Sequence, residues 1–411
     1  MRRLSASRGN SGAPGGFTIM SGRIFLKPGR DVPVRGGNPW IFSGAIERAE
    51  PADAEPGSIV EVRSADGALL GVGYCNLATT IAVRMLWWGG APAIGEVVEA
   101  RLRSAAALRR LVVRSDTDCM RLVNGDGDGL SGVIVDRYGE TLVMQLLTRG
   151  ADRLRDLLIE RLVAMLHPRA IIERSQGAVR RQEGLEDRLG LLWGESVSET
   201  LALENGIRLA IDLEHGQKTG YFLDQRENRA RLGAMAEGAR VLDAYCYAGG
   251  FALAALRGKA RRVVGVDTSA RALSWARRNL SLNGYGEDAA ELVHAEAGEY
   301  MAKTSERFDL ISLDPPPLAR SRKDRARAAR LYARLNELAI RLLAPGGCLM
   351  TFSCSAHFRG EDFVHAVGAA QARAGRNLRI LAHLGPAPDH PVLLGHAEGE
   401  YLSGLLLADL G

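Results

Sequence analysis

The C-terminal half of the chain alternates short hydrophobic runs with longer amphipathic segments. The short runs are rich in Val, Ile and Leu and are bounded by polar or glycine residues, which is typical of buried parallel strands. Strands that alternate with helices in this way predict a parallel, doubly wound α/β sheet. The predicted strands are 240–243, 262–267, 291–294, 308–313, 348–352 and 401–407, and the predicted helices are 251–256, 270–282, 324–343 and 362–372.

The N-terminal part of the chain has short β runs separated by turn residues. Pro56-Gly57 and Asp66-Gly67 lie between these runs, and Asp-Gly is a strong hairpin signal. Many short strands with tight turns predict a small β-barrel. Residues 37–46 resemble the entry helix and following strand of PUA domains, which bind RNA; a generic small barrel is the alternative. The predicted runs are 23–26, 58–63, 69–74 and 81–86.

The middle of the chain reads as a compact α+β module, followed by a hairpin with Asn205-Gly206 as its turn. Its loop 121–130 is rich in Gly and Asp but lacks the Glu that closes an EF-hand loop. A tight turn is therefore favoured over a calcium site. The predicted elements are helices 94–112 and 153–166, strands 133–136 and 170–173, and hairpin strands 199–204 and 207–212.

These patterns predict an α/β protein with several domains. Residues 1–20 are rich in Gly, Ser and Arg and are predicted to be a disordered tail. A PUA-like domain is predicted at 21–92, a central α+β domain at 93–195, and a Rossmann-like domain that begins with the hairpin at 196–411.

Composition fits a cytoplasmic protein. The charged fraction of 25% and the hydrophobic fraction of 46% are ordinary. No run approaches the roughly 20 apolar residues of a membrane span, and no apolar segment follows the N-terminal arginines. The five cysteines form no C-x-x-C pair, which argues against a zinc site and fits a reducing compartment. We therefore expect no metal. A net charge of +5 favours a polyanionic partner weakly and is equally compatible with an ordinary metabolic enzyme.

Residues 244–251 form a candidate loop for a nucleoside cofactor. They connect the predicted strand 240–243 to a helix, and their glycines let the backbone approach a ligand at the helix N-terminus. The next predicted strand ends at Asp267, where an acid can bind both ribose hydroxyls. Because the loop lacks a full G-x-G-x-x-G, a dinucleotide is disfavoured and S-adenosylmethionine, which has no pyrophosphate, is favoured.

Asp314 and Cys354 follow the predicted strands 308–313 and 348–352. Open α/β sheets bind ligands at the carboxyl ends of their strands. A carboxylate and a thiol at neighbouring strand ends predict covalent chemistry on a bound base. The alternatives are a helix-capping acid for Asp314 and a buried core thiol for Cys354.

Five motifs carry a specific resemblance. The chain resembles the bacterial large-subunit ribosomal RNA cytosine-5 methyltransferases that have an N-terminal PUA domain and a class I, S-adenosylmethionine-dependent methyltransferase domain. The motifs are KTGYFLDQRENR (218–229), VLDAYCYAGGFALAAL (241–256), VVGVDTS (263–269), DPPPLARSRKD (314–324) and TFSCS (351–355).

The resemblance implies a set of cofactor contacts. Asp243 and the loop residues Tyr247, Gly249 and Gly250 are expected at the methionine end, and Asp267 at the ribose. Glu296 is expected at the adenine, where the family pattern has the shorter Asp. Tyr221, Asp224, Gln225, Arg226 and Asp314 are expected to wall the same pocket; a helix start capped by Asp224 is the alternative for residues 221–226.

The resemblance also implies a covalent mechanism. Cys354 is the expected nucleophile that adds to C6 of a cytidine, with its thiolate favoured by the sulfonium and nearby cations. Asp314 is expected to hydrogen-bond the cytosine amino group or N3. Pro317 stands where amino-group methyltransferases have an aromatic residue, which argues against attack through an exocyclic nitrogen. Asp389-His390-Pro391 also resembles a family motif, with loop shape as its expected role.

The implied partner is ribosomal RNA with a single-stranded or flipped base. A basic run near Asp314 is either a solvated helix face or a phosphate contact. Whether the protein forms a homodimer is left open by the sequence. One alternative function is methylation of another base atom, such as a guanine ring nitrogen. The other is a PUA-type RNA-binding protein that has lost its methyltransferase activity, and Glu296 and Pro317 are the features that leave this alternative open. The basic residues are Arg320, Arg322, Lys323, Arg325, Arg327, Arg330 and Arg334.

Overall fold

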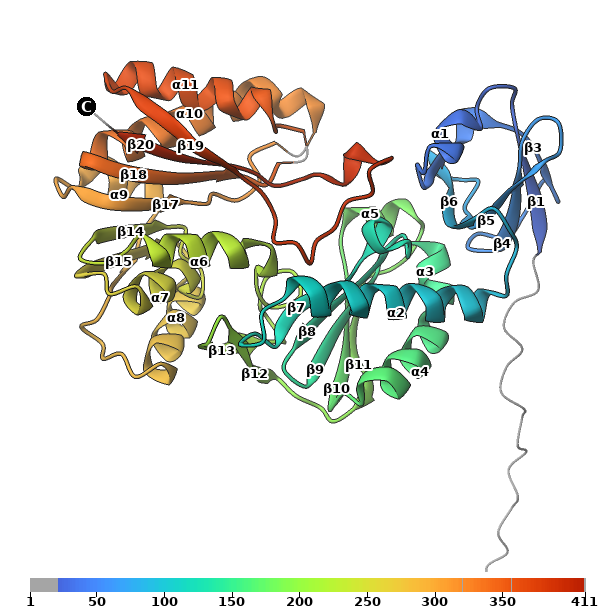
Figure 1. Ribbon diagram of the computed structural model, residues 1–411, viewed down its shortest axis with the longest axis horizontal. Coiled ribbons are helices and arrows are strands. Elements are labelled where there is room, and N and C mark those ends of the chain that lie inside the picture. The colour runs from blue at the N-terminus through green and yellow to red at the C-terminus, as the bar shows by residue number, and fades with distance from the viewer. Residues whose placement is uncertain (1–20, 320, 356, 410–411) are drawn as a thin grey trace, which may run out of the picture.

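The computed structural model describes residues 21–319, 321–355 and 357–409, so the predicted disordered tail at 1–20 lies outside the described residues. The N-terminal part forms a six-stranded sheet in the order β2-β6-β5-β4-β1-β3, drawn in blue at the right of Figure 1. Its elements are β1 (Gly22–Leu26), α1 (Val32–Arg35), β2 (Trp40–Phe42), β3 (Ile46–Glu50), β4 (Ile59–Arg63), β5 (Leu69–Cys75) and β6 (Ile81–Trp88).

The central part forms a five-stranded sheet in the order β11-β10-β9-β8-β7. The long helix α2 buries Ile94, Val97, Val98 and Leu102, a spacing that places these side chains on one face. The elements are α2 (Ile94–Val112), β7 (Cys119–Asn124), β8 (Val133–Tyr138), β9 (Thr141–Leu146), α3 (Arg149–Arg153), α4 (Arg155–Leu166), β10 (Ala170–Ser175), α5 (Ala178–Gln182) and β11 (Arg188–Gly194).

A hairpin of β12 (Glu199–Glu204) and β13 (Ile207–Asp212) leads into a seven-stranded sheet in the order β16-β15-β14-β17-β18-β20-β19. All strands of this sheet run in the same direction except β20, which is antiparallel to its two neighbours, β18 and β19. The elements are α6 (Arg226–Ala234), β14 (Arg240–Ala244), α7 (Gly250–Arg257), β15 (Arg262–Asp267), α8 (Ala270–Leu282), β16 (Glu291–His294), α9 (Ala297–Lys303), β17 (Phe308–Leu313), α10 (Arg325–Leu342), β18 (Leu343–Ser353), α11 (Glu361–Ala374), β19 (Leu378–Leu384) and β20 (Ser403–Asp409).

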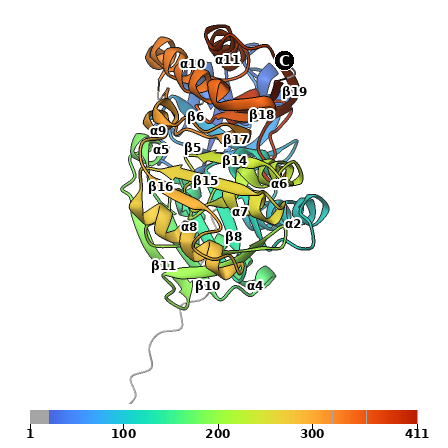
Figure 2. The same ribbon diagram turned by 90° about the vertical axis from the view of Figure 1, so that its left-hand side faces the viewer.

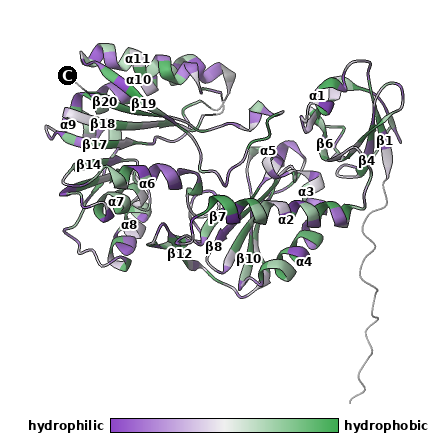
Figure 3. Ribbon diagram, in the orientation of Figure 1, coloured by the Kyte–Doolittle hydropathy of each residue, from purple (hydrophilic) through white to green (hydrophobic). Residues whose placement is uncertain are grey.

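Helices cover both faces of this sheet, with α7 and α8 on one face and α10 and α11 on the other (Figures 1 and 2). The strands between them are largely hydrophobic, whereas hydrophilic segments recur along α10 and α11 (Figure 3). Helix α8 begins where the hydroxyl of Ser269 accepts the N–H of Ala272, an N-cap that satisfies a free donor of the first turn. The order of strands reverses between β14 and β17, and ligands of open α/β sheets bind at such a switch point.

The α/β fold with an N-terminal PUA-like part is confirmed, with local differences from the sequence analysis. The helix expected within residues 37–46 lies earlier in the chain, as α1, which ends at Arg35. Residues 37–46 instead contain β2 and a short 3-10 turn. Strand β18 is longer than the predicted 348–352, and α9 and β19 were not foreseen. The exact bounds of the three predicted domains stay predictions.

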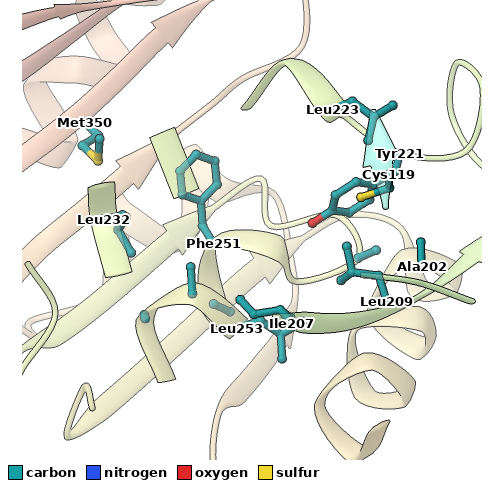
Figure 4. Packing of buried hydrophobic residues seen from close by; sticks show 14 of the residues in the cluster. Cys119, Ala202, Ile207, Leu209, Tyr221, Leu223, Leu232, Phe251, Leu253 and Met350 are labelled. Atoms are coloured by element: carbon teal, nitrogen blue, oxygen red, sulfur yellow. The ribbon is translucent and has the colours of Figure 1, made fainter. Parts of the chain in front are cut away.

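One hydrophobic cluster joins the central part to the seven-stranded sheet. It contains Cys119 of β7, Ile207 and Leu209 of β13, Phe251 of α7 and Met350 of β18, all nearly inaccessible to solvent. Figure 4 shows these side chains together and the ring of Tyr221 among them. Because the cluster crosses between the two sheets, their relative position is fixed by a shared core.

A buried ion pair holds the loop between β19 and β20 (residues 385–402) against the rest of the chain. Arg226 at the start of α6 binds Asp389 through two hydrogen bonds of 2.8 and 3.1 Å, and both residues have no exposed surface. Asp389 also accepts the N–H of Arg121, and its carbonyl accepts a hydrogen bond from Arg109. The loop, red in Figure 1, reaches across the central part, and His396 packs edge-on against Trp40 of β2.

Replacing Asp389 with Ala is expected to destabilise the protein by about 3–5 kcal/mol, because it leaves both terminal nitrogens of the buried Arg226 guanidinium without their carboxylate. The measurement is urea unfolding at neutral pH. The matched control is Glu50→Ala, which breaks the exposed Arg48–Glu50 pair and is expected to cost about 0–1 kcal/mol. Equal losses in the two variants would show that the buried pair has no special weight.

Candidate active site

The register of two parallel strands brings Asp314 and Cys354 together. Leu313 at the end of β17 is paired with Thr351 of β18, so both chains leave the sheet at the same edge. The Sγ atom of Cys354 lies 3.7 Å from the carbonyl oxygen of Pro315. The two residues predicted as catalytic therefore share one end of the sheet, as their positions at strand ends indicated.

The thiol of Cys354 is half-buried, and its surroundings disfavour the thiolate. Burial, followed by the nearby carboxyl of Asp314, raises the pKa of Cys354 to about 12, whereas Lys218 acts in the opposite direction. Lys218 therefore favours the thiolate, as expected of a nearby cation, but in the protein alone burial and the carboxyls outweigh it. Carboxylates outnumber cations around this sulfur, and the sequence did not reveal that balance.

Ser355 fastens the two strand ends to each other. Its hydroxyl accepts the N–H groups of Leu318 and Ala319, at 3.0 and 3.1 Å, and lies 2.9 Å from the hydroxyl of Tyr332 on α10. The segment after Cys354 is thereby tied to the loop after Asp314. Sequence reasoning gave Ser355 no role, although its place in the TFSCS motif was the available signal.

Gln225 orients the carboxyl of Asp314. The Nε2 group of Gln225 donates a 2.9 Å hydrogen bond to Oδ2 of Asp314, and the Oε1 atom of Gln225 accepts from Asn228. Burial, followed by the charge of Asp224, raises the pKa of Asp314 to about 6. Asp314 is therefore mostly ionised at neutral pH but gains a proton readily, which suits either of the hydrogen bonds expected to the base.

Asp224 lies beside this pair and is held ionised. Its Oδ2 atom accepts hydrogen bonds from Lys218 at 3.2 Å and from the hydroxyl of Tyr401 at 2.7 Å. Burial opposes the charge of Asp224, but Lys218 and His390 outweigh it and hold its pKa below the usual range. Its Oδ1 atom is buried and has no hydrogen-bond partner in the described part of the chain. The carboxyl caps neither end of α6, whose N-cap is Gln225, so the helix-cap alternative does not apply.

Arg226, predicted to wall the cofactor pocket, has a different set of contacts. Both of its terminal nitrogens bind Asp389, and its Nε atom lies 3.2 Å from Glu227. The guanidinium therefore has a structural role that the sequence analysis did not foresee, because Asp389 lies far along the chain. The same contact shows that Asp389 does more than shape its own loop.

The loop after β14 is bent by residues in the left-handed region. Tyr245 and Tyr247 have φ angles of 67° and 47° and Gly249 has 80°, and non-glycine residues in this region are strained. The N–H of Tyr247 donates to Asp267 at 2.9 Å, and the N–H of Ser269 donates to the other oxygen at 2.8 Å. Asp267 thus supports the loop while each oxygen keeps lone pairs free for a ribose hydroxyl.

Two buried polar atoms at this loop fit the methionine end of S-adenosylmethionine. The Oδ1 atom of Asp243 and the hydroxyl of Tyr221 have no hydrogen-bond partner among the residues that the structure describes, and burial raises the pKa of Asp243 to about 7. A Cβ atom at Gly250 would collide with the hydroxyl of Tyr221 and with Arg229. The glycine therefore admits Tyr221 to the loop, and an ammonium group would satisfy the carboxyl of Asp243.

Glu296 lies at the same edge but is already engaged. Its Oε2 atom caps α9 by accepting the N–H of Glu299 at 2.7 Å, and its Oε1 atom lies 3.3 Å from the hydroxyl of Tyr245. The side chain is exposed beside the cofactor loop. The adenine contact stays a prediction.

The basic run after Asp314 is only partly paired. Arg325 binds Asp362 and Arg334 lies 3.4 Å from Glu337, whereas Lys323, Arg327 and Arg330 are exposed. Arg320 and the side chain of Arg322 lie outside what the structure describes. The exposed cations are compatible with a phosphate contact, which stays a prediction.

Two family models match the chain. Residues 176–400 match an S-adenosylmethionine-dependent methyltransferase model and residues 24–88 match a PUA-like domain model. The fold and site thus define a methyltransferase of the S-adenosylmethionine-dependent class with an appended PUA-like domain.

Comparison with curated relatives identifies the family within this class of methyltransferases. The chain is 39% identical over 398 residues to the ribosomal RNA large subunit methyltransferase I of Aeromonas hydrophila, covering 94% of this chain and 99% of that one. It is 37% identical over 391 residues to the protein of the same name from Erwinia tasmaniensis, covering 94% and 98%. The chain therefore belongs to the ribosomal RNA large subunit methyltransferase I family.

Solved structures show the same fold at low identity. A candidate S-adenosylmethionine-dependent methyltransferase from Streptococcus mutans has a TM-score of 0.79 at 20% identity, covering 94% of this chain and 99% of that chain. A candidate methyltransferase complexed with SAH has a TM-score of 0.80 at 20% identity and the same coverage. Within the described residues, no helix is long and apolar enough to cross a membrane, and no cluster of His, Cys, Asp or Glu is arranged to hold a metal ion.

Replacing Asp314 with Asn is expected to stabilise the protein at pH 8 but not near pH 4. The pKa of Asp314 in the folded protein, about 6, lies above its ordinary value of about 3.9. Its stabilising contribution is therefore complete below about pH 4 and is lost as the pH rises through 6. We expect the variant to be more stable at pH 8 by about 1–3 kcal/mol, measured by urea unfolding at both pH values.

The matched control is Asp309→Asn on β17, the strand that leads to Asp314. A hydrogen bond from Arg240 lowers the pKa of Asp309, so this variant is expected to lose stability at pH 8 and to show little effect in acid. An Asp314→Asn variant that is less stable than the native protein at pH 8 would contradict the assigned environment of Asp314.

Proposed function

We propose that the protein transfers a methyl group from S-adenosylmethionine to C5 of a cytidine in large-subunit ribosomal RNA, through a covalent bond between Cys354 and C6. The observation that carries this proposal is the position of Cys354, whose Sγ atom lies beside Pro315 next to Asp314. The family of the chain and the buried polar atoms at the cofactor loop support the donor. The names of the relatives support ribosomal RNA as the substrate.

The chemistry requires a nucleophile because C5 of cytosine does not attack a methyl group readily. S-adenosylmethionine, when bound, supplies a methyl group on a sulfonium. The thiolate of Cys354 forms a bond to C6, and the electron pair of the C5–C6 double bond moves to C5. C5 then takes the methyl group as the methyl–sulfur bond breaks. Loss of the C5 proton to a base restores the double bond and expels the thiolate.

In this proposal Asp314 holds the base during the addition. Gln225 fixes its carboxyl with a 2.9 Å hydrogen bond, which leaves Oδ1 to face the cytosine edge. An ionised Asp314 accepts from the exocyclic amino group, whereas the protonated form donates to N3. Either bond holds the ring against Cys354, and a pKa near 6 makes the ionised form the major one at neutral pH.

A hollow between the parts of the chain offers room for flanking nucleotides. It has a volume of about 320 Å³ and is lined by Trp40 and Arg84 of the PUA-like part, by the loop around Asp126, and by His396 and Tyr401. Tyr401 also donates to Asp224 in the active site, so the hollow adjoins the site. An aromatic ring and a cation are groups that bind single-stranded RNA. We infer that the target base is flipped, because C6 is unreachable in a stacked helix.

We also infer that the protein works in the cytoplasm, where its substrate is found and where its five cysteines stay reduced. Association into a homodimer stays a prediction.

Replacing Cys354 with Ala is expected to abolish methyl transfer while leaving cofactor binding unchanged. The measurement is transfer of radiolabel from S-adenosylmethionine to large-subunit ribosomal RNA, with mapping of the modified base, and calorimetry for the cofactor. The matched control is Cys348→Ala, which removes a half-buried thiol on β18, the strand that leads to Cys354, and is expected to retain activity.

Transfer by Cys354→Ala at the full rate would contradict the covalent mechanism, and a labelled guanine would favour the ring-nitrogen alternative. A native protein that binds RNA but not the cofactor would favour the inactive RNA-binding protein.

A further inference from the structure

Lys218 lies in the segment that leads from β13 to α6 and has no role in the mechanism so far. Its backbone has a φ angle of 52°, a left-handed conformation that is strained for a lysine. Its side chain is 43% exposed. The Nζ atom lies 3.2 Å from Oδ2 of Asp224 and 4.6 Å from the centre of the Phe222 ring. Strain of this kind persists where the surrounding structure requires a particular placement.

A series of contacts links Lys218 to the segments that carry the reacting groups. Asp224, which binds Lys218, is followed by Gln225, which binds Asp314. Asp314 is followed by Pro315, whose carbonyl lies 3.7 Å from the Sγ atom of Cys354. The ammonium of Lys218, the carboxylates of Asp224 and Asp314 and the thiol of Cys354 therefore belong to one linked set of groups at this end of the sheet.

Among the charged groups that face Cys354, Lys218 is the strongest one that favours the thiolate. The carboxyls of Asp314 and Asp224 both raise the pKa of Cys354, and Lys218 lowers it. From the remaining elements, Tyr332 on α10 has its hydroxyl bonded to Ser355, and Tyr401 before β20 donates to Asp224. Neither tyrosine supplies a positive charge.

The two members of the Lys218–Asp224 pair thus act on the thiol in opposite directions. Asp224 is buried and fixed by Tyr401, whereas the lysine is half-exposed and held by one ion pair. The carboxylate of Asp224 holds the ammonium of Lys218 in place, but its own negative charge disfavours the thiolate of Cys354. Removing either member is therefore expected to change the reactivity of Cys354, with a sign that depends on which member is lost.

We propose that Lys218 is the positioning residue that sets the charge state of Cys354, with Asp224 as its anchor. The thiol loses its proton to water in the open site, and the ammonium of Lys218 compensates the resulting negative charge on sulfur until the sulfur bonds to C6. The inference rests on the proposed function for its use in methyl transfer, but the charge of the thiol does not depend on RNA.

The test is the rate at which iodoacetamide alkylates Cys354 between pH 7 and 10, followed on the Cys354 peptide by mass spectrometry. Lys218→Gln is expected to slow alkylation at a given pH by about tenfold, which corresponds to a rise of about one unit in the pKa of the thiol. Asp224→Asn is expected to accelerate it severalfold. Lys218→Arg is expected to restore most of the rate, because it keeps the charge.

The matched control is Lys259→Gln, which removes an exposed lysine that pairs with Glu237 on the surface and is expected to leave alkylation unchanged. A loosened structure would expose the thiol and accelerate alkylation in both Lys218→Gln and Asp224→Asn. Opposite signs in these two variants therefore support the proposal. Equal signs, or an unchanged rate in Lys218→Gln, overturn it.

Methyl transfer gives an independent measurement. Lys218→Gln is expected to shift the pH profile of kcat to higher pH, with the KM for S-adenosylmethionine unchanged; a fall in cofactor affinity instead would overturn the proposal. If Cys354→Ala still methylates RNA, the proposed function fails while the alkylation result for Lys218 stands. If alkylation does not respond to Lys218 while Cys354→Ala is inactive, the role of Lys218 fails and the proposed function stands.

Discussion

The parallel pairing of β17 with β18 is the constraint on which the site depends. Because Leu313 faces Thr351 in that register, Asp314 and Cys354 leave the sheet at one edge, beside the loop after β14. A shift of one residue would turn each side chain to the opposite face. The hydroxyl of Ser355 reinforces the register by binding both N–H groups of the neighbouring loop. The chemistry of the protein thus follows from sheet geometry.

The arrangement has an energetic cost that other parts of the chain offset. Asp243, Asp314 and Cys354 all have raised pKa values because burial disfavours their charged forms. Functional sites commonly combine such groups at the expense of stability. The hydrophobic cluster shared by two sheets and the buried Arg226–Asp389 pair supply rigidity around them. The loop that carries Asp389 also contacts the PUA-like part through His396.

Local sequence signals determined the elements, whereas long-range partners could not be foreseen. The bounds of α2 and α8 match the prediction, because their hydrophobic spacing is regular and, in α8, Ser269 caps the first turn. Asp314 and Cys354 were found because strand ends are recognisable. The ion pair of Arg226 could not be foreseen, because its partner lies 163 residues away. The raised pKa of Cys354 depends on burial and on the carboxylates of Asp314 and Asp224, which come from two distant segments of the chain and which no local pattern reveals.

The central claim is that Cys354 bonds to C6 of the target cytidine, and a trapped adduct tests it most directly. In RNA that carries 5-fluorocytidine, methyl transfer leaves no proton at C5 to remove, so the thiolate cannot be expelled. We predict a protein–RNA complex that resists denaturation, forms only with S-adenosylmethionine, and maps to Cys354. Transfer to natural RNA without a trapped complex on the fluorinated RNA, or a complex that maps to another residue, would contradict the account.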